Sequence, residues 1–233
     1  MTNAAAVTQD QLQSIAYSTD NGATWNTTSI DNTEQVISVN LNAGGKVLWK
    51  GTGVSMALGY NDNQYSFFNS TKQFNVLGNI MSLLFGDGFA SQTVLQTVFP
   101  DESIYTFSRL FDGCAQLISA ENLILPASIM VQSCYFSMFQ DCTSLTQVPG
   151  LPATTLAENC YSNMFSGCTS LTQVPELPAT SLANGCYSYM FSTCTSLVQA
   201  PELPATTLAN GCYEGLFNYC RSEEHTSELQ SRP

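Results

Sequence analysis

The chain has 233 residues and a formal net charge of −12, although only 10% of its residues are charged. Its single histidine, His225, lies in the last stretch of the chain, as do Arg221 and Arg232. The other basic residues are Lys46, Lys50, Lys72 and Arg109. So few cations are a poor match for a row of phosphates, which argues against nucleic acid and anionic membranes as partners. The stretch before residue 225 also lacks histidine, the usual general base at neutral pH.

Residues 1–12 are small and polar, and we expect them to be disordered or to form a leader. They have neither the basic region nor the apolar region of a signal peptide. No stretch approaches the roughly 18 apolar residues of a membrane-spanning helix. The sequence therefore predicts no membrane insertion.

Residues 13–78 alternate with a period of two, and we expect them to form a small β-sandwich. Asp20-Asn21-Gly22 is a strong hairpin signal, because alternating residues flank it on both sides. Further strands are predicted over 37–41, 47–49, 64–68 and 73–77.

One motif in this region, formed by Ser18, Asp20, Gly22, Thr24 and Trp25, resembles the Asp-box of sialidase propellers and other β proteins. In those families the motif is structural, and it lies away from the catalytic side. The Asp carboxylate suits backbone N–H groups in the turn, and Gly permits a positive φ. A sialidase also needs several such boxes and an arginine cluster. One box and one arginine before residue 221 favour a structural hairpin over a glycosidase.

The stretch after residue 104 repeats a cysteine-bounded frame. The first cysteines of the regular frames are Cys134, Cys160, Cys186 and Cys212, so the period is 26 residues. A fixed period in this range is the signature of a solenoid. We expect a degenerate first frame at 106–114, a solenoid over 104–220, and an atypical N-terminal cap over 79–103.

Each repeat is predicted to hold a short strand and a two-turn helix. In 160–168 the apolar residues fall at positions i, i+1, i+4, i+5 and i+8, which fits one face of a helix. The strand is expected over 171–174, because Pro175 cannot continue a ladder of backbone hydrogen bonds. The predicted fold class is therefore α+β and β-rich, a small sandwich followed by a solenoid.

The repeat resembles the BspA-like, or Treponema-type, bacterial leucine-rich repeat. The matching residues are Leu171 and Val174, Leu177-Pro178, Leu182, and Met190-Phe191 with Cys194. The unit departs from that frame, because Pro175-Glu176 adds a residue before the apolar-Pro pair. The resemblance implies secreted or surface-attached proteins that serve in adhesion or binding. It implies no active site and no cofactor.

The cysteines allow three interpretations. Two cysteines of one helix would lie roughly 12 Å apart, too far for a disulfide, and the spacing is not that of a zinc site. Disulfides between neighbouring repeats stay open as an alternative, but we favour free thiols that serve as small buried apolar residues. The predicted core ladder comprises Cys134, Cys142, Cys160, Cys168, Cys186, Cys194, Cys212 and Cys220.

Residues 221–233 break the repeat abruptly. Residues 221–231 correspond codon by codon to the translation of a common sequencing-library adapter, so we interpret 221–233 as an artefactual tail. On that interpretation the repeat is interrupted in mid-frame.

The leading functional hypothesis is a non-catalytic surface module that binds a protein or glycan ligand. Its candidate face consists of Thr146, Gln147, Thr172, Gln173, Gln199, Glu176 and Glu202. Solenoids bind along such repeated faces, although the same residues also serve to keep a strand face soluble. The alternatives are a carbohydrate-active enzyme or glycan-binding component, and a structural protein of a phage or mobile element. The family resemblance implies an extracellular or cell-surface location.

Overall fold

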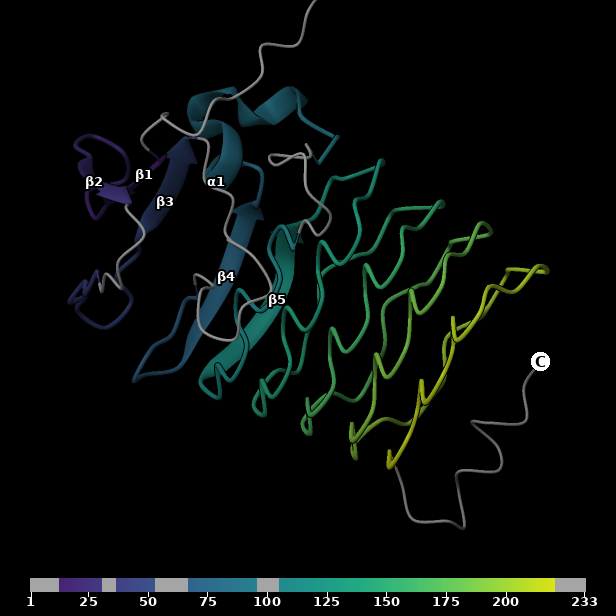
Figure 1. The fold of residues 1–233 in the computed structure, drawn as a ribbon. Helices are drawn as coiled ribbons and strands as arrows, with labels where there is room; N and C mark the ends of the chain where they lie inside the picture. Colours follow the sequence, from purple (N-terminus) through teal and green to yellow (C-terminus); the bar gives the residue numbers. More distant parts are fainter. Residues whose placement is uncertain (1–12, 31–36, 53–66, 96–104, 221–233) are drawn as a thin grey trace, which may run out of the picture. The chain divides into compact units, whose positions relative to one another are not determined.

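The computed structural model describes residues 13–30, 37–52, 67–95 and 105–220. The predicted leader (1–12) and the predicted tail (221–233) lie outside these residues. The chain divides into two compact parts (Figure 1). We call residues 1–55 with 79–92 the N-terminal domain, and residues 56–78 with 93–233 the repeat domain.

A three-stranded antiparallel sheet forms the N-terminal domain. Its strands are β1 (Gln13–Ser18), β2 (Asn26–Ile30) and β3 (Leu48–Thr52), in the order β2-β1-β3. Strand β1 pairs with β2 across the turn at Asp20, so the predicted hairpin is confirmed. The alternating residues 37–41 form no strand, although we predicted one there.

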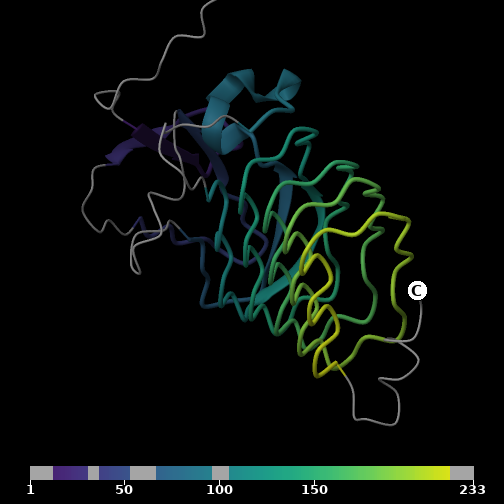
Figure 2. The same ribbon diagram turned by 45° about the vertical axis from the view of Figure 1, so that its right-hand side comes forward.

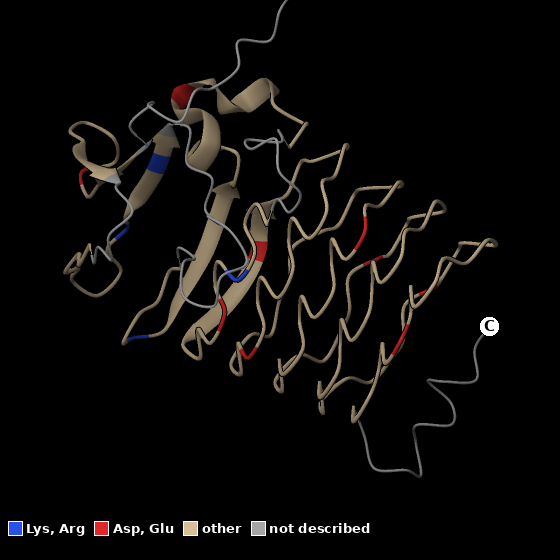
Figure 3. Ribbon diagram, viewed as in Figure 1, with Lys and Arg blue, Asp and Glu red and all other residues tan. Residues whose placement is uncertain are grey.

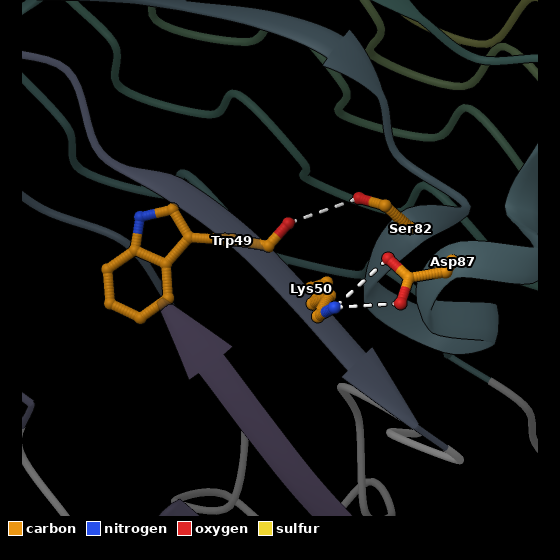
Figure 4. A network of polar contacts seen from close by, with 4 residues as sticks. All are labelled: Trp49, Lys50, Ser82 and Asp87. Atoms are coloured by element: carbon orange, nitrogen blue, oxygen red, sulfur yellow. Dashed lines mark hydrogen bonds and ion pairs between the residues drawn. The ribbon is translucent and has the colours of Figure 1, made fainter. Parts of the chain in front are cut away.

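Helix α1 (Ser82–Phe85) and the 3-10 helix η1 (Gly86–Ser91) pack against β3. Leu83 and Leu84 are buried, and the Ser82 hydroxyl donates a hydrogen bond to the Trp49 carbonyl (Figure 4). Residues 79–92 therefore belong to the N-terminal domain, whereas we predicted a solenoid cap over 79–103. The predicted boundary at residue 78 also differs, because the last strand predicted for the sandwich lies in the repeat domain.

That strand is β4 (Phe74–Asn79), and it pairs with β5 (Leu117–Ile124). The amide of Phe74 donates to the carbonyl of Gln116 at 3.1 Å. Just before β4, the Phe68 amide donates to the Leu110 carbonyl at 2.8 Å, and the Phe68 ring stacks on Phe111. Residues 67–78 are thus an additional repeat that precedes the degenerate frame.

Each later repeat contains a turn segment, which we define as residues 134–142, 160–168, 186–194 and 212–220. The backbone amides of this segment donate alternately to carbonyls of the same segment and to carbonyls of the next repeat. One set closes turns within the segment, as when Met138 donates to Tyr135 at 3.2 Å. The other set bonds the next repeat, as when Tyr135 donates to Cys160 at 3.0 Å. Consecutive repeats therefore stack in strict register, and the coils run side by side in both views (Figures 1 and 2).

The turn segments are not the two-turn helices that we predicted. The segment 160–168 is a chain of turns, and the backbone is left-handed near every fourth residue, at Asn159, Asn163 and Gly167 (φ 52°, 55° and 76°). In a helix, the amides after the first turn would bond carbonyls of the same segment. Here half of the amides are satisfied by the neighbouring repeat instead.

The predicted strand at 171–174 is also reduced. In the described residues, parallel pairing between regular repeats is limited to isolated bridges, such as Thr155 with Ser181, and to single bonds, such as Val198 to Thr172 at 3.2 Å. Leu171 is nevertheless fully buried.

Columns of identical side chains fill the core of the repeat domain. The phenylalanine column consists of Phe68, Phe111, Phe139, Phe165, Phe191 and Phe217, with ring centroids 5.3–5.8 Å apart. The tyrosine column consists of Tyr135, Tyr161, Tyr187 and Tyr213, and Phe107 stacks on its first member. Within the described residues, no helix is long and apolar enough to cross a bilayer.

Candidate binding surface

The candidate face lies beside a row of buried leucines. Leu145, Leu171 and Leu197 are fully buried, and the two residues after each of them are exposed. The amide of Thr146 donates to Ile118 at 2.9 Å, and Val198 donates to Thr172 in the same way. The predicted residues Thr146, Gln147, Thr172, Gln173 and Gln199 therefore stand at equivalent, exposed positions of consecutive repeats.

Two features of this face escaped the sequence analysis. Val198, 62% exposed, occupies the position of Thr146 and Thr172, so the column is β-branched and not purely polar. The Thr146 hydroxyl donates to the carbonyl of Ile118 at 3.1 Å, which leaves its lone pairs for a ligand. The sequence signal for this column was the position directly after each buried leucine, whichever residue type occupies it.

A second exposed face was also missed. It follows the stretches 153–156, 179–182 and 205–208, which read Ala-Thr-Thr-Leu or Ala-Thr-Ser-Leu. There a bridge joins Thr155 to Ser181, and the Thr180 amide donates to Thr154 at 3.2 Å. The exposed hydroxyl residues of this face are Thr154, Thr155, Thr180, Ser181, Thr206 and Thr207. The repeated dipeptide of hydroxyl residues before a leucine was the available signal.

The described part of the repeat domain carries more acidic than basic residues (Figure 3). Its described acidic residues are Asp112, Glu121, Asp141, Glu158, Glu176, Glu202 and Glu214, against Lys72 and Arg109. Glu176 and Glu202, the acidic members of the candidate face, are exposed. Burial raises the pKa of Asp112, and Arg109, 3.5 Å away, acts in the opposite direction.

The nine cysteines of the chain are free and buried. Burial raises the pKa of Cys134 to about 12 and that of Cys186 to about 11, so their thiols stay protonated at neutral pH. In the described part of the chain, no group of three His, Cys, Asp or Glu side chains is placed to hold a metal ion. The arrangement suits packing and not thiolate chemistry.

The Asp-box residues form the local network expected of a structural hairpin. The carboxylate of Asp20 accepts the Thr24 hydroxyl at 2.6 Å, the Thr24 amide at 2.9 Å and the Ser18 hydroxyl at 2.7 Å. These bonds lower the pKa of Asp20 to about 2, with the Thr24 hydroxyl as the largest cause. The Ser18 oxygen in turn accepts the amide of Gly22, whose φ is 90°.

Trp25, the last residue of the box, packs beside the sheet. The ammonium of Lys50 lies 4.1 Å from the centroid of its ring, a cation–π contact. The same ammonium forms an ion pair with Asp87 of η1 at 2.8 Å (Figure 4). Lys50 of β3 thus contacts both Trp25 of the box and Asp87 of η1. The contacts of the box residues serve the structure of the hairpin.

No protein-family model, curated protein or solved structure matches the chain.

Proposed function

We propose that the repeat domain is a non-catalytic binding or adhesion module. It presents Thr146, Gln147 and the residues at the equivalent positions of the later repeats to a protein or glycan ligand. The main support for this proposal is that uncharged residues at equivalent positions of consecutive repeats are exposed, each pair directly after a fully buried leucine. Hydrogen-bonded neighbouring chains lie about 4.8 Å apart, so such an array offers donors and acceptors at a fixed spacing. An extended ligand with its own regular polar groups is the partner that suits it.

Rigidity supports this proposal. The backbone under the face is held by the register of the turn segments, and the aromatic columns fix the core between repeats. A surface that is ordered before binding loses little conformational freedom when the ligand arrives. The proposed fold, a leucine-rich-repeat solenoid of the BspA-like type, and the proposed extracellular or cell-surface location accord with such a display.

The Asp-box motivated the alternative of a carbohydrate-active enzyme. The Asp20 carboxylate is occupied by Thr24 and Ser18, and its low pKa keeps it ionised, so it is unsuited to donate a proton. A hairpin role accounts for each of these contacts. The proposal therefore assigns no catalytic residue and no cofactor.

A glycan array and a panel of extracellular-matrix proteins, probed with the purified full chain, test the proposal. The decisive variant replaces Gln147, Gln173 and Gln199 by Ala together. The matched control replaces Thr154, Thr180 and Thr206 by Ala, which changes the same number of exposed residues on the second face. We expect the glutamine variant to lose binding, and the control to retain it with an unchanged circular dichroism spectrum.

Three outcomes would overturn the proposal. They are the absence of any bound glycan or protein, equal binding by the parent and the glutamine variant, and sustained hydrolysis of a glycoside panel by the parent. The last outcome would establish the enzyme in place of the binding module.

A further inference from the structure

The tyrosine column carries hydroxyl groups into the core of the repeat domain. Tyr135, Tyr161 and Tyr187 are 0–1% exposed, and consecutive ring centroids lie 5.8, 5.9 and 5.7 Å apart. The ring planes differ by only 11°, 11° and 2°. Nearly parallel rings at equivalent positions place their hydroxyl oxygens in a line, at about the spacing of the rings.

Three hydroxyls of this column lack protein partners. Among the residues that the structure describes, the buried hydroxyls of Tyr135, Tyr161 and Tyr213 form no hydrogen bond. Buried polar groups in proteins are almost always bonded, either to the protein or to ordered water. Three unbonded hydroxyls in one column therefore require an explanation.

Stacking alone does not explain the hydroxyls. Phe107 stands before Tyr135 in the same column, with the centroids 6.0 Å apart and the planes at 11°. A ring without a hydroxyl therefore fits this stack. The neighbouring column achieves the same spacing with phenylalanine throughout. A phenol that stayed unbonded would only cost stability relative to phenylalanine.

The spacing itself identifies a partner. Hydroxyls about 5.8 Å apart cannot bond each other directly, because an O–H···O bond spans about 2.8 Å. Two such bonds in series, through one oxygen atom, span about 5.6 Å. We propose that the tyrosine column binds buried water, with one molecule bridging the consecutive hydroxyls of Tyr135 and Tyr161.

The chemistry of the column suits this ligand. Burial raises the pKa of Tyr135 and Tyr161, so both phenols stay protonated. A protonated phenol donates one hydrogen bond and accepts another, and water does both. The bridging water would thus gain two partners from the column, the minimum that buried waters require.

A high-resolution crystal structure of the full chain, compared with that of Tyr161→Phe, tests the proposal. We expect ordered water within about 3 Å of the Tyr135 and Tyr161 hydroxyls in the parent, and its loss beside position 161 in the variant. We also expect Tyr161→Phe to lower the equilibrium constant of folding, by up to about tenfold, because a bonded hydroxyl is removed.

The matched control is Tyr189→Phe. It makes the same change at a half-buried residue, whose hydroxyl donates an exposed hydrogen bond to Glu214 at 3.3 Å, and we expect little change in folding. Absence of water density at the Tyr135 and Tyr161 hydroxyls would overturn the proposal. So would a Tyr161→Phe variant that is as stable as the parent or more stable, since it would show that the hydroxyl is unbonded.

Discussion

The thiol of Cys168 donates a hydrogen bond of 3.1 Å to the carbonyl oxygen of Phe139 in the preceding repeat. That oxygen also accepts the backbone amide of Cys142 at 3.2 Å. The same bond recurs from Cys142 to Phe111, from Cys194 to Phe165 and from Cys220 to Phe191, at 2.9–3.0 Å. The second cysteine of each turn segment thus links two repeats. Cysteine fits because it is small and apolar, yet carries a weak donor.

Replacement of Cys168 by alanine should therefore cost more stability than replacement of Cys160. Both side chains are fully buried, but of these two thiols only that of Cys168 donates to a carbonyl of the preceding repeat within the described residues. Cys160→Ala removes packing alone, whereas Cys168→Ala also removes a hydrogen bond. We expect the free energy of unfolding to fall by about 0.5–1 kcal/mol more in Cys168→Ala, measured by urea denaturation under reducing conditions. Equal losses would show that the thiol bond contributes nothing.

The stability of the fold should decrease in alkali. Burial raises the pKa of Cys134 from 9.0 to about 12. Between these two values the unfolded chain has released the proton and the folded chain has kept it, so a rising pH favours unfolding. The stabilisation is fully present below pH 9 and is lost progressively toward pH 12. Urea midpoints measured from pH 8 to pH 11 check this trend.

The matched variant for the alkaline trend is Cys134→Ala. It should reduce the slope of the unfolding free energy by about 1.4 kcal/mol per pH unit in this window. An unchanged slope would mean that the Cys134 thiol titrates alike in both states.

The burial of Cys160, Met164 and Phe165 was predictable from their spacing, but their conformation was not. The same spacing fits a helix and a chain of turns with a four-residue period. The distinction rests on Asn159, Asn163 and Gly167, residues that tolerate a left-handed backbone. It also rests on amides that bond a neighbouring repeat, and such a pairing exists only once the repeats have stacked.

The additional repeat at 67–78 was missed because its cysteine position is occupied by Thr71. Phe68 and Phe74 nevertheless keep the spacing of Phe165 and Leu171, so the signal was present. The exposed face around Thr146 and Gln147 was found because a pair of uncharged residues directly after each leucine is a local pattern. The partnerless hydroxyl of Tyr161 was not predictable, since it depends on how rings of different repeats stack.

The Asp20 carboxyl should titrate at about pH 2, and Thr24→Val should raise its pKa toward 3.8. The Thr24 hydroxyl is the largest cause of the shift, and valine removes it while keeping the shape of the side chain. Because the folded pKa is the lower one, Asp20 stabilises the hairpin above pH 3.8, and this support is lost as the pH falls through 2. An NMR titration of the carboxyl carbon measures the change.

The control for Asp20 is Thr27→Val, the same substitution at an exposed position of β2. It should leave the titration unchanged. A Thr24→Val variant whose Asp20 carboxyl still titrates at about pH 2 would contradict the role of the hydroxyl.

Alanine should be tolerated less well at Gly167 than at Gly113, although both glycines hold equivalent positions of the repeat. Their φ angles are 76° and 70°, so the backbone cost, about 1 kcal/mol, is shared. They differ in their neighbours. A Cβ at Gly167 would clash with a carboxylate oxygen of Asp141 and lie 3.3 Å from its Cα, whereas nothing lies within 4 Å at Gly113.

We expect Gly167→Ala to lower the free energy of unfolding by about 1 kcal/mol more than Gly113→Ala, because the Asp141 side chain must move away. Removal of that side chain should cancel the difference, so Gly167→Ala in an Asp141→Ala background should cost as little as Gly113→Ala. Thermal and urea denaturation of the single and double variants measure the coupling. A penalty at Gly167 that persists without the carboxylate would place the clash in the backbone of Asp141, and an equal penalty at both glycines would show that the left-handed φ alone requires glycine.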